Sequence, residues 1–261
     1  MELTPEQIKN NWDKLLDIIS KHISSPRKEK LIELYTTYDE RISLMPASYK
    51  KEFHNCFPGG YVDHVIRVFE CAHELHHLWG KMGSNTSSYD LEELSFSAIN
   101  HDLGKIGDEN HESYIPQDNE WRRKTLGETY KFNGALQFAS VPDRSLYILQ
   151  ANGIQYSINE MIAIQTHDGL YDEGNKKYLL GFTPEQKPRN PLPFILHQAD
   201  LMASRIEFER VWGSILNPQE NNVEGANKDN KLPPSNRKTP TKDKALKGIK
   251  SDGLKNMLDK I

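Results

Sequence analysis

Apolar residues recur at helical spacing along most of residues 1–216, and this periodicity restricts the fold more than any other feature. Ile8, Trp12 and Leu15 share one face after Thr4 and Pro5, two residues that favour a helix start. Comparable stripes predict further helices over residues 26–45, 61–81, 90–102, 157–167 and 193–212. Residues 103–135 predict loop and a short helix, and the sequence allows a short β-hairpin across residues 171–182. No segment has a strand pattern comparable to the helical stripes, so the predicted fold is all-α.

The composition changes after residue 216 and divides the chain. Residues 217–244 are rich in Asn, Lys, Pro and Gly and almost free of apolar side chains, which predicts a flexible linker. Residues 245–261 regain an amphipathic pattern and predict a short helix, which either docks back on the body or captures a protein partner. The predicted body has N-terminal helices in residues 1–45 that pack on a core domain of residues 46–216.

Charge and cysteine content narrow the class of protein. The chain carries −4 in total, but the tail from residue 217 carries ten basic and six acidic residues, which leaves about −8 on the body. The net negative charge of the body therefore does not favour a protein that coats nucleic acid through bulk charge. A local basic groove that binds nucleic acid remains an alternative. Cys56 and Cys71 are too few for a disulfide framework, and no signal sequence or membrane-spanning run is present. These features predict a cytoplasmic protein with free thiols and no membrane partner.

One histidine motif is a decoy. His73, Glu74 and His77 match the H-E-x-x-H zinc-protease pattern, but Gly83 stands where a third histidine ligand would follow. On a helix over residues 61–81, His64 shares the apolar face, whereas the H-E-x-x-H residues lie on the opposite, charged side. The phase of the helix therefore places His64 on the buried face, where a histidine that packs in the core is the usual interpretation unless other residues join it.

Two further segments bring chemically matched residues. The helix that ends near residue 102 delivers His101 and Asp102 together, and Asp200 lies among apolar residues of the last predicted helix. A buried carboxylate is costly unless it is paired or binds a metal. Imidazoles and carboxylates in one site suit Mn, Fe, Co, Ni, Zn or Mg, and two of each leave positions open for water and a phosphate oxygen.

The order His64, His101-Asp102, Asp200 on successive helices resembles the HD-domain metal-dependent phosphohydrolase superfamily. The similar region runs from about His54 to Glu209, more than half of the chain. The resemblance implies an HD-domain helical bundle, with the flexible tail attached, in which His64, His101, Asp102 and Asp200 bind a divalent ion.

Within that superfamily, the chain is most similar to the HD domain of CMP-binding-factor-type 3′–5′ exoribonucleases. The similar motifs include P-G-G-Y-V-D-H ending at His64, H-D-L-G-K starting at His101, and T-H-D-G around His167. That group carries an N-terminal OB-fold domain, whereas residues 1–60 here predict helices. It also has a Gly-His after the HD motif, where this chain has Gly127 and Glu128. Glu128 and His167 are candidates for a second ion, so one-metal and two-metal sites both stay open.

The resemblance implies hydrolysis of a phosphoester or phosphoanhydride of a nucleotide or oligonucleotide. Asp102 would also orient the attacking water, Lys105 would neutralise phosphate charge, and His167 would transfer a proton. His54 and Arg205 are candidate substrate contacts, although a salt bridge to Glu209 would also account for Arg205. Two alternatives are a 3′–5′ exonuclease on single-stranded RNA or DNA, and a non-catalytic HD-fold module that recruits a protein partner through its C-terminal tail.

Overall fold

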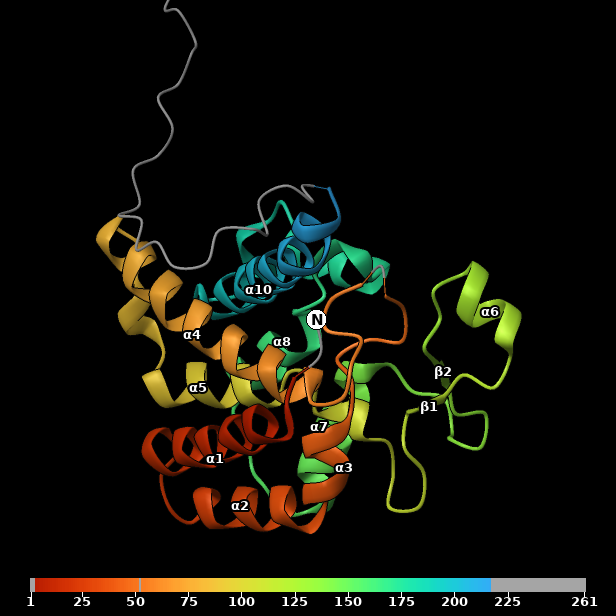
Figure 1. The fold of residues 1–261 in the computed structure, drawn as a ribbon. Coiled ribbons are helices and arrows are strands. Elements are labelled where there is room, and N and C mark those ends of the chain that lie inside the picture. The colour runs from red at the N-terminus through yellow and green to blue at the C-terminus, as the bar shows by residue number, and fades with distance from the viewer. Residues whose placement is uncertain (1–2, 52, 217–261) are drawn as a thin grey trace, which may run out of the picture. The chain divides into compact units, whose positions relative to one another are not determined.

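The computed structural model describes residues 3–51 and 53–216, the last six as backbone only, and this part of the chain is mostly helical (Figure 1). Its α-helices are α1 (Pro5–His22), α2 (Arg27–Thr37), α3 (Asp39–Leu44), α4 (Gly60–Lys81), α5 (Leu91–Asn100), α6 (Glu120–Thr125), α7 (Val141–Ala151), α8 (Ile158–Thr166), α9 (Lys176–Leu179) and α10 (Leu192–Leu216). Its strands are β1 (Tyr114–Pro116) and β2 (Tyr130–Phe132), and its 3₁₀ helices are η1 (Thr86–Ser88), η2 (Leu103–Ile106), η3 (Gly169–Tyr171), η4 (Glu173–Asn175) and η5 (Pro184–Gln186). The all-α prediction is confirmed. The predicted linker and C-terminal helix lie outside the described residues.

Helix starts agree with the capping signals in the sequence. Thr4, Asp90 and Ser157 each form a complete capping box at the N-terminus of α1, α5 and α8, respectively. The predicted helix over residues 26–45 is instead two helices, because the chain leaves helical geometry at Tyr38.

The centre of the fold is the pair α4 and α10, which pack against each other more extensively than any other two described elements. α5 packs against α4 and α8, and α1 covers α4 and α5. Fully buried apolar residues of three of these helices fill the space between them, among them Val65, Val68, Leu94, Leu196 and Ala199. This core surrounds the buried polar residues described below.

The predicted hairpin across residues 171–182 is wrong. The segment contains η4 and α9, and the Asp172 side chain accepts a hydrogen bond from the backbone N–H of Gly174, which favours a tight turn over an extended strand. A hairpin occurs elsewhere, within residues 103–135: β1 and β2 pair antiparallel with Ile115 opposite Lys131, and α6 lies between them in sequence. This hairpin lobe lies to the right of the helical body in Figure 1.

A further helix, α7, has no counterpart in the sequence prediction. The Ser140 side chain caps its first turn and Pro142 lies within that turn. α7 packs against η2, the segment that follows the His101-Asp102 pair. It therefore forms the support for one side of the candidate site.

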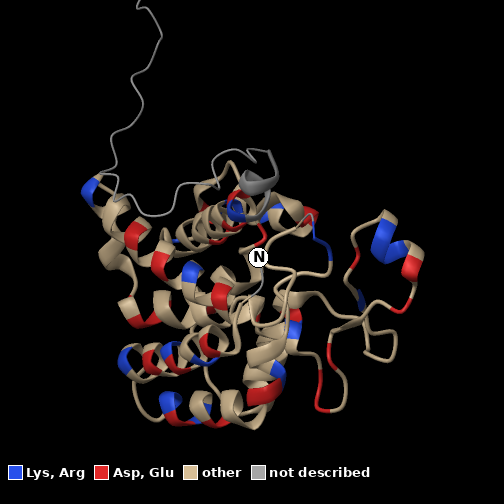
Figure 2. Cartoon of the chain, viewed as in Figure 1, with Lys and Arg blue, Asp and Glu red and all other residues tan. Residues whose placement is uncertain are grey.

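The surface of the described part is polar and of mixed charge. Figure 2 shows acidic and basic residues interspersed on α1 and α2, and a basic run on α6 that comprises Arg122, Arg123 and Lys124. None of the helices in the described ranges combines the length and the apolar character that crossing a bilayer requires.

Candidate metal centre

His64 enters the site from the first turns of α4 and is completely buried. Its Nδ1 lies 3.1 Å from the Oε2 atom of Glu207, on α10. Its Nε2 lies on the other edge of the ring, 3.2 Å from the Oδ1 atom of Asp200. The two nitrogens of His64 therefore face two different carboxylates.

His101 and Asp102 follow directly on the end of α5. The Nδ1 of His101 donates to the carbonyl of Ala98 at 2.8 Å, which leaves its Nε2 directed toward the site. Because a carbonyl can only accept, this contact fixes the donor side of the imidazole.

The turn after Asp102 is held against α7. The backbone N–H of Gly104 donates to the hydroxyl of Ser145 at 2.7 Å, and that hydroxyl donates to the carbonyl of His101 at 3.0 Å. A Cβ on Gly104 would lie 2.2 Å from the carbonyl oxygen of Val141. Glycine is therefore required for the close approach of α7, which in turn positions His101 and Asp102.

His167 is delivered by the end of α8 in the same way as His101. Its Nδ1 donates to the carbonyl of Ile164 at 2.8 Å, and its Nε2 lies 3.6 Å from the Oδ1 atom of Asp102. Asp168 follows and lines the open side of the site. The carbonyl of His167 accepts from the Nδ1 of His197 at 2.8 Å, so α10 also holds this turn.

The ligand-type atoms converge on one region. The Nε2 atoms of His64 and His101 are 3.4 Å apart, and the Oδ2 atom of Asp102 lies 3.6 Å and 3.5 Å from them, respectively. Asp200 is 4.0 Å from the Nε2 of His101. Four overlapping triads of described residues have ligand atoms spaced closely enough for a metal ion: His54, His64 and Glu207; His64, His101 and Asp200; His101, Asp102 and His167; and His167, Asp168 and Asp200. These buried His/Asp clusters could hold a metal ion.

Electrostatic coupling in the site favours charged groups. Burial alone would lower the pKa of His64, but the carboxylates of Glu207 and Asp200 outweigh it and raise this pKa to about 10. Burial likewise opposes the charge on His167, whereas Asp168, Asp102 and Asp200 raise its pKa to about 9. Burial would raise the pKa values of Asp102 and Asp200, yet the neighbouring cationic groups hold both below their usual range. Without a metal, protons on histidine therefore balance the carboxylates.

Lys105 supplies a further balancing charge. Its ammonium group bonds to the Oδ2 atom of Asp102 and donates to the carbonyl of Ala47 at 2.8 Å. Burial opposes the charge, but Asp102 more than offsets this and raises the pKa of Lys105. The structure therefore places Lys105 beside the candidate ligands.

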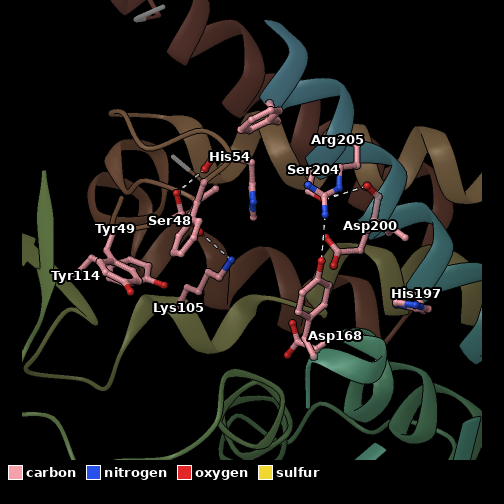
Figure 3. Close-up of a pocket in the computed structure, with 15 residues that line it drawn as sticks. Ser48, Tyr49, His54, Lys105, Tyr114, Asp168, His197, Asp200, Ser204 and Arg205 are labelled. Carbon is pink, nitrogen blue, oxygen red and sulfur yellow. Dashed lines mark hydrogen bonds between the residues drawn. The ribbon is translucent and has the colours of Figure 1, made fainter. Parts of the chain in front are cut away.

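An open pocket of about 550 Å³ adjoins these residues (Figure 3). One wall carries Ser48, Tyr49, His54, Lys105 and Tyr114, and α10 contributes Asp200, Ser204 and Arg205 to the other. The pocket is also lined by Ala47, Phe53, Asp168, Tyr171, His197, Leu201 and Phe208.

Two predicted substrate contacts lie on this pocket. The Nε2 of His54 is buried and has no hydrogen-bond partner in the described structure, and its ring lies 4.5 Å from that of His64. The exposed side chain of Arg205 donates to the hydroxyl of Tyr171 at 3.1 Å. This contact, and not the alternative salt bridge to Glu209, is the one that the structure contains.

Glu128 and the H-E-x-x-H residues lie away from the candidate metal centre. Both carboxylate oxygens of Glu128 accept from Arg122, at 2.6 Å and 3.0 Å, and none of the metal-type clusters of described residues includes Glu128. The structure therefore does not bring Glu128 together with His167. In the H-E-x-x-H motif, His73 is half-buried and bonds to Ser95 while His77 is exposed, and neither belongs to such a cluster.

Glu207 and Asp168 are site residues that sequence reasoning missed. Glu207 follows Asp200 by seven residues, which is two helical turns, and it is fully buried. An acid seven residues after a predicted ligand lies on the same face of a helix, so its spacing was a usable signal. Asp168 lies next to His167 in sequence, but its direction depends on the turn that Gly169 makes.

Comparisons with protein-family models, with curated proteins and with solved structures found no match for this chain.

Proposed function

We propose that the chain is an HD-type metal-dependent phosphohydrolase that cleaves a phosphoester or phosphoanhydride bond of a nucleotide or oligonucleotide. One observation carries this proposal: the Nε2 atoms of His64 and His101 and the carboxylates of Asp102 and Asp200 converge beside an open pocket. The resemblance of the motif order to HD-domain phosphohydrolases supports the same conclusion.

The donor set fits a divalent metal. His101 presents an Nε2 whose opposite nitrogen is already committed as a donor, the arrangement typical of metal-binding histidines. With His64, Asp102 and Asp200 it forms a mixed imidazole and carboxylate set that suits Mn, Fe, Co, Ni, Zn or Mg. An ion there would supply Lewis-acid chemistry: it would polarise a phosphoryl oxygen and lower the pKa of water, so that water loses a proton and becomes a better nucleophile toward phosphorus.

The remaining residues have roles that follow from their positions. Asp102 orients the attacking water, and Lys105, bonded to Asp102, neutralises charge that develops on the phosphate. His167 holds a proton at Nε2, within reach of the same carboxylate, and gives it to the leaving oxygen. His167 with Asp168 is also the place where a second ion would bind.

The pocket accounts for substrate binding in this proposal. Its volume of about 550 Å³ lies within the range of small-molecule sites. Arg205 provides a charged donor for a phosphate group, and His54 lines the same pocket. The ring of Tyr49, on the opposite wall, provides a face on which a nucleobase can stack.

The proposal is tested by assaying mono-, di- and triphosphates of nucleosides, cyclic nucleotides and short oligonucleotides with Mn, Co, Ni, Zn and Mg. We expect metal-dependent release of phosphate or nucleotide, and a loss of rate of about 100-fold or more in Asp102→Ala. Asp13→Ala is the matched control, because Asp13 is exposed on α1 and forms only a surface ion pair. Absence of bound metal together with unchanged rates in His101→Ala would contradict the enzyme and leave the non-catalytic binding module.

A second candidate function is a 3′–5′ exonuclease on single-stranded nucleic acid. A second hollow of about 460 Å³ shares Tyr49 with the pocket and is also lined by Arg122, Lys131 and Phe132 of the hairpin lobe. The Phe132 ring is 61% exposed and lies 5.0 Å from that of Tyr49. Exposed rings with nearby cations are typical of surfaces that bind single strands, so a chain longer than one nucleotide would use both hollows.

Phe132→Ala separates the two functions. For an exonuclease we expect about a tenfold loss of affinity for a single-stranded tetranucleotide, because stacking on one base is lost, with no change for a mononucleotide. Phe138→Ala, which removes a ring that is 88% exposed and lines neither hollow, is the control. Equal effects on both substrates would favour the mononucleotide enzyme.

A further inference from the structure

Glu207 is a completely buried carboxylate that none of the proposed catalytic steps uses. It lies on α10, two turns after Asp200, and faces the edge of His64 that points away from the other candidate ligands. Its Oε1 and Oε2 atoms are 3.2 Å and 3.1 Å from the Nδ1 of His64. The opposite ring nitrogen, Nε2, is the one that lies among Asp102, Asp200 and His101.

A second bond fixes the carboxylate. The Nε of Arg67, one turn after His64 on α4, donates to the Oε1 atom of Glu207 at 3.1 Å. Arg67 also donates to the Oδ2 atom of Asp63 at 3.1 Å, and Asp63 accepts from the Nδ2 of Asn55 at 3.0 Å. Glu207 is therefore held by two groups of α4, and one of them, Arg67, is held in turn by Asp63.

This arrangement is not explained by packing alone. Taking a carboxylate out of water is costly, and a buried ion pair is often no more stabilising than apolar residues of the same volume. Glu207 lies on α10, which packs against α4, and its side chain is fully buried. An apolar side chain could bond neither to the Nδ1 of His64 nor to the Nε of Arg67, and the first of these contacts fixes a candidate metal ligand.

We infer that Glu207 is a positioning residue for the metal centre: it holds the proton of His64 on Nδ1 and orients the ring so that the Nε2 lone pair faces the ion. Arg67 keeps the Glu207 carboxylate in the geometry that this requires. A carboxylate behind a metal-binding histidine raises its basicity and fixes its tautomer. The inference rests on the metal centre of the proposed function and does not depend on which phosphoester is cleaved.

The test measures the affinity of the whole chain for Mn²⁺ alone, by calorimetry in wild type and Glu207→Gln. Glutamine keeps the shape but removes the charge, so we expect Mn²⁺ binding to weaken by about 10- to 100-fold. Glu209→Gln is the matched control, because Glu209 lies on the same helix but is exposed, and it should bind as wild type does. If Glu207→Gln does not fold, Glu207→Asp gives the same test, since the shorter side chain keeps the charge but no longer reaches Nδ1.

The outcomes separate the inference from a structural role and from the proposed function. Circular dichroism shows that each variant is folded at the temperature of the titration, and thermal melts give its melting temperature. A merely structural role would lower the melting temperature without changing the Mn²⁺ affinity. Affinity within twofold (~2-fold) of wild type in a folded Glu207 variant overturns the inference. Wild-type protein that binds Mn²⁺ but cleaves no phosphoester contradicts the proposed function alone, whereas wild-type protein that binds no divalent ion contradicts both.

Discussion

Gly169 shows how a single backbone conformation holds part of the site. Its φ is +61°, and a Cβ at this position would lie 2.0 Å from the Cε1 atom of His197. Gly169 follows Asp168 directly and is the first residue of η3. The His197 imidazole, which would meet the added Cβ, donates from Nδ1 to the carbonyl of His167. Any side chain here must displace His197 or turn the preceding residues away from the centre.

Replacing this glycine should therefore destabilise the protein. We expect Gly169→Ala to lower the free energy of unfolding by about 1–3 kcal/mol, from backbone strain and the clash with His197, and to weaken metal binding. Gly134→Ala is the control, because a Cβ there meets nothing within 4 Å. Urea titration of both variants measures the difference, and equal midpoints would show that the turn relaxes without cost.

The protonated histidines predict how the stability of the metal-free protein depends on pH. In an unfolded chain His64 and His167 have pKa values of about 6.5, whereas in the folded chain these are about 10 and about 9. Between these values the folded chain binds more protons than the unfolded one, so stability is fully present below about pH 6.5 and is lost as pH rises through 9 to 10. Asp102 and Asp200 act oppositely: their pKa values are lowered, so their contribution is lost only as pH falls below about 4.

Chelator-treated protein should accordingly unfold at lower urea concentration at about pH 9.5 than at about pH 6. Mn²⁺ competes with the same protons, so its affinity should rise with pH and its presence should reduce the loss of stability. A midpoint that does not change between the two pH values would contradict the raised histidine pKa values.

At the scale of elements, local signals explain what could be predicted. Thr4, Asp90 and Ser157 mark helix starts because a side chain close in sequence completes each cap, and the phase of α4 separates His64 from the H-E-x-x-H decoy. The hairpin lobe could not be placed in this way, because its strands have three residues each and pair across a separate helix. Likewise, His64 was visible as a polar residue on an apolar face, but its pairing with Glu207 depends on how two distant helices pack.

The contact between α7 and η2 gives a prediction at this scale. The buried hydroxyl of Ser145 accepts from Gly104 and donates to the carbonyl of His101, so it joins α7 to the turn that follows His101 and Asp102. Ser145→Ala leaves a buried N–H without a partner and should lower the free energy of unfolding by about 1–3 kcal/mol. Ser87→Ala, at an exposed serine of η1, should be close to neutral. Equal denaturation midpoints for the two variants would show that the contact is dispensable.

At the scale of the molecule, a half-buried arginine joins the N-terminal helices to the rest of the helical body. The Nη1 of Arg27, on α2, donates to both carboxylate oxygens of Glu160 on α8, at 2.8 Å and 2.9 Å, and Nη2 bonds to Glu92 on α5. The guanidinium also lies over the ring of Phe96, 4.2 Å from its centre. Three helices that are distant in sequence therefore meet at one side chain.

Removing Arg27 should be among the more damaging single changes far from the site. Glu160 is fully buried, so Arg27→Ala leaves an uncompensated carboxylate and should cost about 3–5 kcal/mol of unfolding free energy. Lys9→Ala, which breaks an exposed pair with Asp13, should change it by less than about 0.5 kcal/mol. Thermal or urea unfolding compares the two, and a double variant Arg27→Met, Glu160→Gln should recover part of the loss.

The spread of the candidate ligands along the chain has a consequence for assembly. His64 and Asp200 lie on α4 and α10, and the loop between them contains α5, α7 and α8. An ion bound to both would act as a reversible cross-link that closes this loop, and it would stabilise the folded chain because the site exists only when both helices are in place. Because protons on His64 and His167 balance the same carboxylates beforehand, the chain can fold first and acquire its cross-link afterwards. Supply of metal would then adjust how firmly the bundle is closed.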